Sequence, residues 1–209
     1  RQERLDTYKE LFYLHPSVFT PDKQVLRDCG FNPDEKYILV RFVAWNASHD
    51  IGKHGLDDEG KIRLVKRLER YGRGYVSAEG DVPEELRPRL LKTPYELIHH
   101  VLAFAQLVFS EGATMASEAA VLGTHALYVN TIVSGSTREQ SERFHLMDCF
   151  NEGEDRYERA AARAEELLAT PGLKEIGLEK QKKLLSEKVD INGYYMAEMD
   201  RLAKAGRKG

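Results

Sequence analysis

The sequence predicts an α/β fold, a Rossmann-like three-layer α/β/α domain with a parallel sheet, followed by C-terminal helices. Residues 37–43 are apolar except for one arginine, as in a parallel strand covered on both faces. Shorter apolar runs at 74–77, 107–110 and 126–129 are separated by helical patterns, which predicts right-handed βαβ units. Beyond residue 150 the apolar spacing is helical only.

Several helices are predicted from spacing and start signals. Residues 59–71 carry apolar side chains three or four positions apart, which describes an amphipathic helix. Thr20, followed by proline, predicts the start of a helix that Gly30 ends. Thr93-Pro94-Tyr95-Glu96 has the pattern of a capping box and predicts another helix start. A further helix is predicted over about 115–122, after the third strand.

The chain is interpreted as three parts. Residues 1–16 are read as a connector from a preceding N-terminal domain, because the chain opens at Arg1 without methionine and Pro16 closes an irregular stretch. Residues 17–150 are predicted to form the Rossmann-like domain. Residues 151–209 are predicted to be helices that pack on the same domain.

Composition excludes several classes of partner. A formal net charge of −3 gives no basic footprint for nucleic acid. The most apolar stretch, residues 101–109, is far shorter than the ~20 residues of a membrane helix, so no transmembrane segment is predicted. Cys29 and Cys149 are far apart and outside any metal-binding spacing, which predicts a cytoplasmic protein with no metal and no cofactor.

A candidate anion site follows the third predicted strand. Ligands of open α/β sheets lie at the carboxyl ends of the strands. There, Ser110-Glu111-Gly112-Ala113-Thr114 lets backbone N–H groups and a helix start approach an anion closely. Dinucleotide and Walker motifs are absent from the sequence. A plain tight turn between strand and helix explains the same residues equally well.

Two charged features lie inside predicted elements. Arg41 is within the strongest predicted strand, where a buried charge needs a partner, so we expect an ion pair, with a ligand contact as the alternative. His99 and His100 are adjacent on a predicted helix, where neighbouring side chains point about 100° apart. The two histidines are therefore expected to face different ways, with one of them reaching the ligand-binding cleft at the carboxyl ends of the strands.

Residues 110–123 resemble the donor-binding segment of nucleotide-sugar enzymes. They are similar to the Gly-Ala…Ser-Glu…Gly stretch of the N-acetylglucosaminyltransferases that act on undecaprenyl-pyrophosphoryl-muramyl-pentapeptide, and more loosely to UDP-N-acetylglucosamine 2-epimerases. Through residues 13–16, 41–45 and 48–50, the chain also resembles the second half of a bacterial and archaeal glycosyltransferase-like family described as a domain of unknown function. The resemblance implies a GT-B architecture, in which two Rossmann-like domains face each other and the C-terminal one holds the nucleotide.

The resemblance also assigns roles to individual residues. Gly112, Ala113 and Thr114 fall where the relatives' backbone meets the diphosphate. Glu118 falls where a glutamate accepts hydrogen bonds from ribose hydroxyls, a task that suits an acceptor-only carboxylate. The alternative for Glu118 is a charge that only favours the helix dipole.

Two further segments are candidates. Thr137-Arg138-Glu139-Gln140 resembles an Asp-Arg-Gln-Gln stretch that contacts the sugar in the transferase, although Glu139 departs from it; a solvated helix start is the alternative. Ser48 and His49 follow the first strand, and in the epimerases a histidine after the same strand contacts the diphosphate. A structural loop histidine is the alternative. The predicted nucleotide-sugar-binding residues are Ser48, His49, Gly112, Ala113, Thr114, Glu118, Arg138, Glu139 and Gln140.

The predicted function is the UDP-sugar-binding half of a glycosyltransferase-like protein of surface polysaccharide or glycolipid synthesis, with the UDP-sugar as substrate. The general base, the acceptor site and any peripheral membrane association are expected in the N-terminal half. The chain alone is therefore expected to bind nucleotide without turnover. A 2-epimerase-like enzyme and a non-catalytic nucleotide-sugar-binding module are the alternatives, because a fold does not guarantee an activity.

Overall fold

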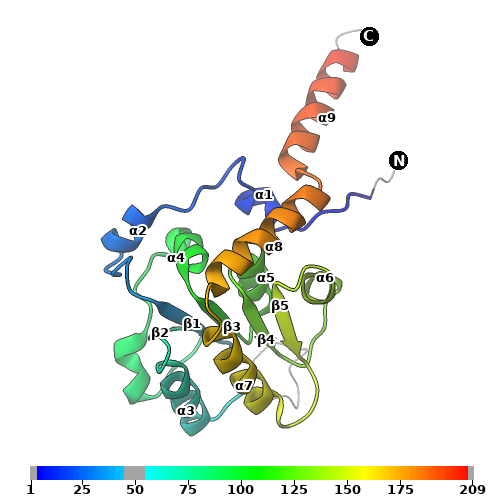
Figure 1. Cartoon of the computed structure of the whole chain (residues 1–209). Helices are drawn as coiled ribbons and strands as arrows, with labels where there is room; N and C mark the ends of the chain where they lie inside the picture. Colours follow the sequence, from blue (N-terminus) through cyan, green and yellow to red (C-terminus); the bar gives the residue numbers. More distant parts are fainter. Residues whose placement is uncertain (1–3, 45–54, 207–209) are drawn as a thin grey trace.

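Five parallel strands lie between two layers of helices (Figure 1). The computed structural model describes residues 4–44 and 55–206. The strand order is β2-β1-β3-β4-β5, and Val40 of β1 pairs with Val76 on one side and Phe109 on the other. The strands are β1 (Tyr37–Phe42), β2 (Arg73–Ala78), β3 (Leu107–Ser110), β4 (Ala126–Val129) and β5 (Met147–Phe150).

Helices cover both faces of this sheet, which confirms the predicted α/β/α fold. Leu39, Val108 and Tyr128 of the strands face one core cluster, and Ile38, Val40 and Leu127 face the other. The first face is covered by α1 (Leu11–Leu14), α2 (Lys23–Asp28), α4 (Ile98–Phe104), α5 (Ala113–Val121) and α8 (Leu173–Glu187). The second is covered by α3 (Asp58–Leu68), the 3-10 helix η2 (Glu84–Arg89) and α7 (Arg156–Leu168).

The edge strand β5 was missed by the sequence prediction. It has four residues, and only Met147 is fully buried. Asp148 lies within it and would normally argue against a strand. Its carboxylate is paired with His125 at 3.0 Å and with Arg163 at 3.0 Å, so tertiary contacts stabilise a charge that the local pattern does not favour.

Two predicted helix starts are wrong. The N-cap of α2 is Asp22, whose side chain accepts a hydrogen bond from the backbone N–H of Gln24, so Thr20 is not the cap. Residues 93–96 do not form a capping box, because the chain makes a 3-10 turn, η3 (Tyr95–Leu97), before α4 begins. Among the described residues, the buried Thr93 Oγ1 has no hydrogen-bond partner.

Helix α8 approaches the end of α5 closely. Gly123 ends α5 with φ +74°, as predicted for a helix-stopping glycine. A Cβ atom on Gly177 of α8 would lie 2.3 Å from the carbonyl oxygen of Gly123. Gln181 Nε2 donates to the carbonyl of Val121 at 2.7 Å. Position 177 therefore requires glycine for this backbone approach.

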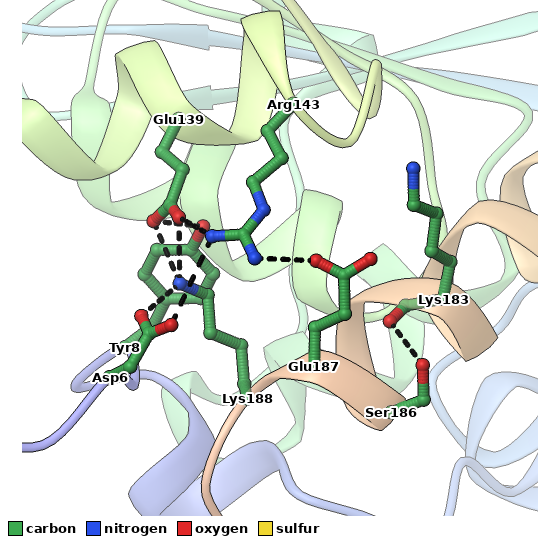
Figure 2. A network of polar contacts seen from close by, with 8 residues as sticks. All are labelled: Asp6, Tyr8, Glu139, Arg143, Lys183, Ser186, Glu187 and Lys188. Carbon is green, nitrogen blue, oxygen red and sulfur yellow. Dashed lines mark hydrogen bonds and ion pairs between the residues drawn. The ribbon is translucent and has the colours of Figure 1, made fainter.

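The early residues of the chain meet the end of α8. Val189 N–H donates to the carbonyl of Asp6 at 3.0 Å, and Thr7 Oγ1 donates to the carbonyl of Val189 at 3.0 Å. Figure 2 shows the Lys188 ammonium beside the carboxylates of Asp6 and Glu139. From this junction, α9 (Ile191–Gly206) extends away from the sheet (Figure 1).

Residues before Pro16 also contribute to the core, since Leu11 and Leu14 of α1 are buried in the first cluster. The division of the chain at residues 16 and 150 stays a prediction. Within the described residues, no helix is both long and apolar enough to cross a bilayer.

Candidate functional site

The strand order creates a topological switch point between β1 and β3. The chain continues from β1 to β2 on one side, and from β3 to β4 and β5 on the other. Ligands of open parallel sheets bind outside the carboxyl ends of the strands at such a point. The turn 110–112 after β3 lies there and leads into α5. The predicted site residues Ser48 and His49, in the loop after β1, lie outside the described residues.

A hollow of about 690 Å³, here called the α5 pocket, opens at this end of the sheet. It lies between the ends of β1 and β2, the segment 90–99 and the first turns of α5. Its polar lining includes Arg41, Ser77, Glu79, His99, Thr114 and Glu118. Its apolar lining includes Val76, Leu90, Leu91, Ile98 and Met115.

Internal hydrogen bonds fix the turn that opens α5. Ser110 Oγ accepts from the N–H of Gly112 at 3.0 Å and donates to the carbonyl of Gly112 at 2.8 Å. The Glu111 carboxylate is buried and accepts from Val43 N–H at 2.9 Å and from Tyr157 Oη at 2.6 Å. The Glu111 carboxylate therefore stabilises the fold through these hydrogen bonds. The N–H groups of the first helical turn have no intrahelical acceptor and favour an anion.

Gly112 is not required by local packing. Its φ of −98° is open to any residue. A Cβ atom at this position would meet Val43 Cγ1 at 3.5 Å and Ser110 Oγ at 3.7 Å, which are ordinary contacts. Because Gly112 lines the α5 pocket, its missing side chain leaves the backbone open to close approach by a ligand.

Glu118 lies one turn further along α5 and lines the same pocket. Its Oε1 accepts from Tyr13 Oη at 2.9 Å and lies 3.2 Å from His99 Nε2. In the described part of the chain, Oε2 has no hydrogen-bond partner, so it is the oxygen that a ligand hydroxyl can reach. Burial, together with the Glu118 charge, raises the pKa of Tyr13, so its phenol remains a donor.

The two adjacent histidines face different directions, as expected. His99 lines the α5 pocket, whereas His100 Nδ1 accepts from the N–H of Asp22 at 2.9 Å. Burial lowers the pKa of His100, which suits a neutral acceptor. Within the described residues, no group of three or more His, Cys, Asp or Glu side chains is arranged to hold a metal ion.

Arg41 has the expected ion pair. Its Nη2 lies 2.6 Å from Glu79 Oε1, and its Nη1 donates to Ser77 Oγ at 2.7 Å. Both partners belong to β2 or follow it directly, and all three side chains line the α5 pocket. The pocket therefore contains a guanidinium that is held in place by Ser77 and Glu79, and the Glu79 carboxylate balances its charge.

The α6 residues predicted to contact a sugar lie apart from the α5 pocket. Arg138 of α6 (Gly135–Glu142) lines a separate hollow of about 350 Å³. Glu139 contacts Lys188 at 2.8 and 2.9 Å. Gln140 is buried and donates to Ser117 Oγ at 2.7 Å.

The structure thus brings together four of the predicted residues, Gly112, Ala113, Thr114 and Glu118, in one hollow. It adds Tyr13 as the donor to Glu118, which sequence reasoning missed. Tyr13 is 105 positions away from Glu118 in the chain. A contact between residues so far apart leaves no local pattern in the sequence.

No protein-family model matches the chain, and no curated protein matches it. Solved structures do match. The glycotransferase of kitacinnamycin aligns at TM-score 0.53 and 14% identity, over 81% of this chain and 44% of that chain. The calicheamicin glycosyltransferase CalG4 aligns at TM-score 0.50 and 19% identity, over 80% and 42%. The UDP-GlcNAc 2-epimerase from Neisseria meningitidis bound to UDP-GlcNAc aligns at TM-score 0.44 and 12% identity, over 78% and 47%.

The chain spans less than half the length of each of these matched structures. At such identities the likeness concerns the fold. The chain therefore has the Rossmann-like α/β/α fold that occurs in GT-B glycosyltransferases, as the sequence predicts.

Proposed function

We propose that this chain binds the UDP-sugar donor of a glycosyltransferase-like protein. The observation that carries the proposal is the α5 pocket, where the start of a helix and a carboxylate one turn later line one hollow at the switch point of the sheet. The fold supports the proposal, because two of the matched structures, aligned at TM-scores of 0.53 and 0.50, are named as a glycotransferase and a glycosyltransferase.

The diphosphate would bind at the first turn of α5, against the N–H groups of Ala113 and Thr114. During transfer, the bond between the anomeric carbon and the diphosphate oxygen breaks. Negative charge then builds up on the leaving diphosphate. Fixed N–H donors and the helix dipole stabilise that charge without reorganising, which lowers the barrier.

Glu118 would hold the ribose. Its Oε2 accepts hydrogen bonds from ribose hydroxyls, while Tyr13 and His99 hold Oε1 in place. In this proposal the general base and the acceptor site belong to an N-terminal domain of the same cytoplasmic protein. Arg138, Glu139 and Gln140 stay predicted sugar contacts, and Ser48 and His49 stay predicted phosphate contacts.

Glu118→Ala should weaken UDP binding by roughly 10- to 100-fold, because a hydrogen bond to a charged group contributes about 1.5–3 kcal/mol. Calorimetric titration of the chain with UDP, GDP and TDP measures this. Glu179→Ala on α8 is the control, since Glu179 is exposed and pairs only with Lys182 among the described residues. Unchanged UDP affinity in a folded Glu118→Ala variant would overturn the ribose role.

Gly112→Ala tests whether a ligand approaches this backbone closely, in a variant that should still fold. The added Cβ makes ordinary contacts, so the free energy of unfolding should fall by less than about 1 kcal/mol, as for alanine at an N-cap. UDP affinity should fall about tenfold, because the methyl group stands between the phosphate and the backbone. Gly135→Ala at the start of α6 is the matched control, since nothing lies within 4 Å of its added Cβ. Equal UDP affinity in both variants would argue against a phosphate at this turn.

A further inference from the structure

Tyr95 is an aromatic residue that the fold leaves open to solvent at the mouth of the α5 pocket. It is 87% exposed, the largest fraction among the exposed large hydrophobic residues in the described part of the chain. It nevertheless belongs to the lining of the α5 pocket. Burying a tyrosine ring is favourable, so a ring left at the edge of a hollow offers a large contact surface to a ligand.

The segment that carries Tyr95 is fixed by backbone hydrogen bonds. Leu91 N–H donates to the carbonyl of Val76 at 2.8 Å, which ties the segment to β2. Pro94 has a restricted φ, and its carbonyl accepts from Leu97 N–H at 3.0 Å in η3. Binding of a ligand against the ring then has to order only the two side-chain torsions of the tyrosine.

Tyr95 lies one turn from the residue that touches Glu118. Tyr95, Ile98 and His99 are three and four positions apart and all line the α5 pocket, so they share one face of η3 and the start of α4. His99 Nε2 lies 3.2 Å from Glu118 Oε1. Neighbours at this spacing have Cβ atoms about 5–6 Å apart, so little more than the His99 side chain separates Tyr95 from Glu118.

This arrangement follows the order of the parts of a nucleoside diphosphate. In the proposed function, the diphosphate binds near Thr114 and the ribose binds at Glu118, one turn further along α5. The base is attached to the ribose at the side away from the diphosphate. From Glu118, the lining of the α5 pocket continues through His99 to Tyr95, so Tyr95 lies where a base would follow the ribose.

The wall of the α5 pocket around Tyr95 suits the flat face of a base. Its other side chains are apolar and come from Leu90, Leu91 and Ile98. The charged side chains of Arg41 and Glu79 in the same pocket are paired with each other at 2.6 Å. An uncharged aromatic group therefore fits this wall better than a charged one, and nucleobases are groups of that kind that stack readily on aromatic side chains.

We propose that Tyr95 is the platform on which the nucleobase of the ligand stacks, so that the α5 pocket recognises a nucleoside diphosphate through its base as well as its diphosphate and ribose. This role of Tyr95 rests on the proposed function, because it requires the diphosphate at the start of α5 and the ribose at Glu118. Stacking uses the ring surface of the tyrosine and does not require its hydroxyl group.

Two substitutions of Tyr95 separate the ring from the hydroxyl group. Tyr95→Ala should weaken UDP binding by roughly 5- to 100-fold, the usual effect of removing an aromatic ring that stacks on a base. Tyr95→Phe should bind UDP within about twofold of the wild type, because the ring remains. Calorimetric titration measures both. Tyr195→Ala is the matched control, because Tyr195 is half-exposed on α9 and lies outside the pocket lining.

Ribose 5-diphosphate, which has no base, distinguishes stacking from any other effect of the substitution. Its affinity should be the same for the wild type and Tyr95→Ala. Two results would overturn the role of Tyr95: a Tyr95→Ala variant that binds UDP as tightly as the wild type, or one that loses affinity for UDP and ribose 5-diphosphate equally. A wild-type chain that binds neither ligand would instead contradict the proposed function, and the role of Tyr95 would fall with it.

Discussion

Lys188→Met should lower the free energy of unfolding by about 2 kcal/mol, because it removes a buried ammonium that donates hydrogen bonds to two carboxylates. The Lys188 side chain is 1% exposed, and its ammonium contacts Glu139 at 2.8 Å as well as Asp6 (Figure 2). The ammonium also lies 4.7 Å from the ring centroid of Tyr8. Methionine retains most of the apolar stem of lysine, so the loss of stability measures the contribution of the ammonium group. Urea unfolding measures the difference.

Lys182→Met on α8 provides the control for this substitution. Lys182 is 71% exposed and pairs with an equally exposed Glu179, so its loss should change stability by less than about 0.5 kcal/mol. A Lys188→Met variant as stable as the Lys182→Met control would contradict the assignment.

The stability that Lys188 contributes should also depend on pH. Burial acts to raise the pKa of Glu139, but hydrogen bonds from Lys188, Tyr8 and Arg143 outweigh it, so this pKa lies below its ordinary value. A carboxyl group of this kind contributes stability above its unfolded pKa of about 4.3, and the contribution is lost as the pH falls through the lower folded value. The gap between wild type and Lys188→Met should therefore shrink below about pH 4.

Gly177→Ala should destabilise the fold by about 2–3 kcal/mol, because the added Cβ would lie 2.3 Å from the carbonyl oxygen of Gly123. Both groups belong to packed backbone, so α8 must move away from the end of α5. That movement also strains the hydrogen bond from Gln181 to Val121. Thermal unfolding and urea titration both measure the loss.

The Gly135→Ala variant is the control for Gly177→Ala, since Gly135 is also helical and its added Cβ has nothing within 4 Å. It should be neutral or slightly stabilising, because alanine favours helix and restricts the unfolded chain. If Gly177→Ala proves as stable as Gly135→Ala, the close approach of α8 to α5 is wrong.

Local pattern was sufficient for most of the fold. The apolar run at 37–43 and the shorter runs at 107–110 and 126–129 predicted strands because strands buried on both faces need continuous apolar residues. The strand at 147–150 was missed because Asp148 depends on partners that lie far away in sequence. The failed capping box at 93–96 likewise shows tertiary packing overriding a local signal.

The candidate site was only partly predictable for the same reason. Ala113, Thr114 and Glu118 belong to α5, and Gly112 is its N-cap, so their spacing in the sequence keeps them close to one pocket. The direction in which α6 turns Glu139 and Gln140 depends on Lys188 and Ser117, which belong to other helices or their ends. A pattern of neighbouring residues cannot predict contacts between residues so far apart in the sequence.

The pairing of Asp6 and Thr7 with residues 188 and 189 limits how early the chain can fold on the ribosome. Partners 182 positions apart cannot meet until the ribosome has made all the residues between them. Closing a loop of that length costs about 4.6 kcal/mol of entropy, beyond a constant. Asp6 and Thr7 therefore stay without these partners until the last part of α8 leaves the exit tunnel.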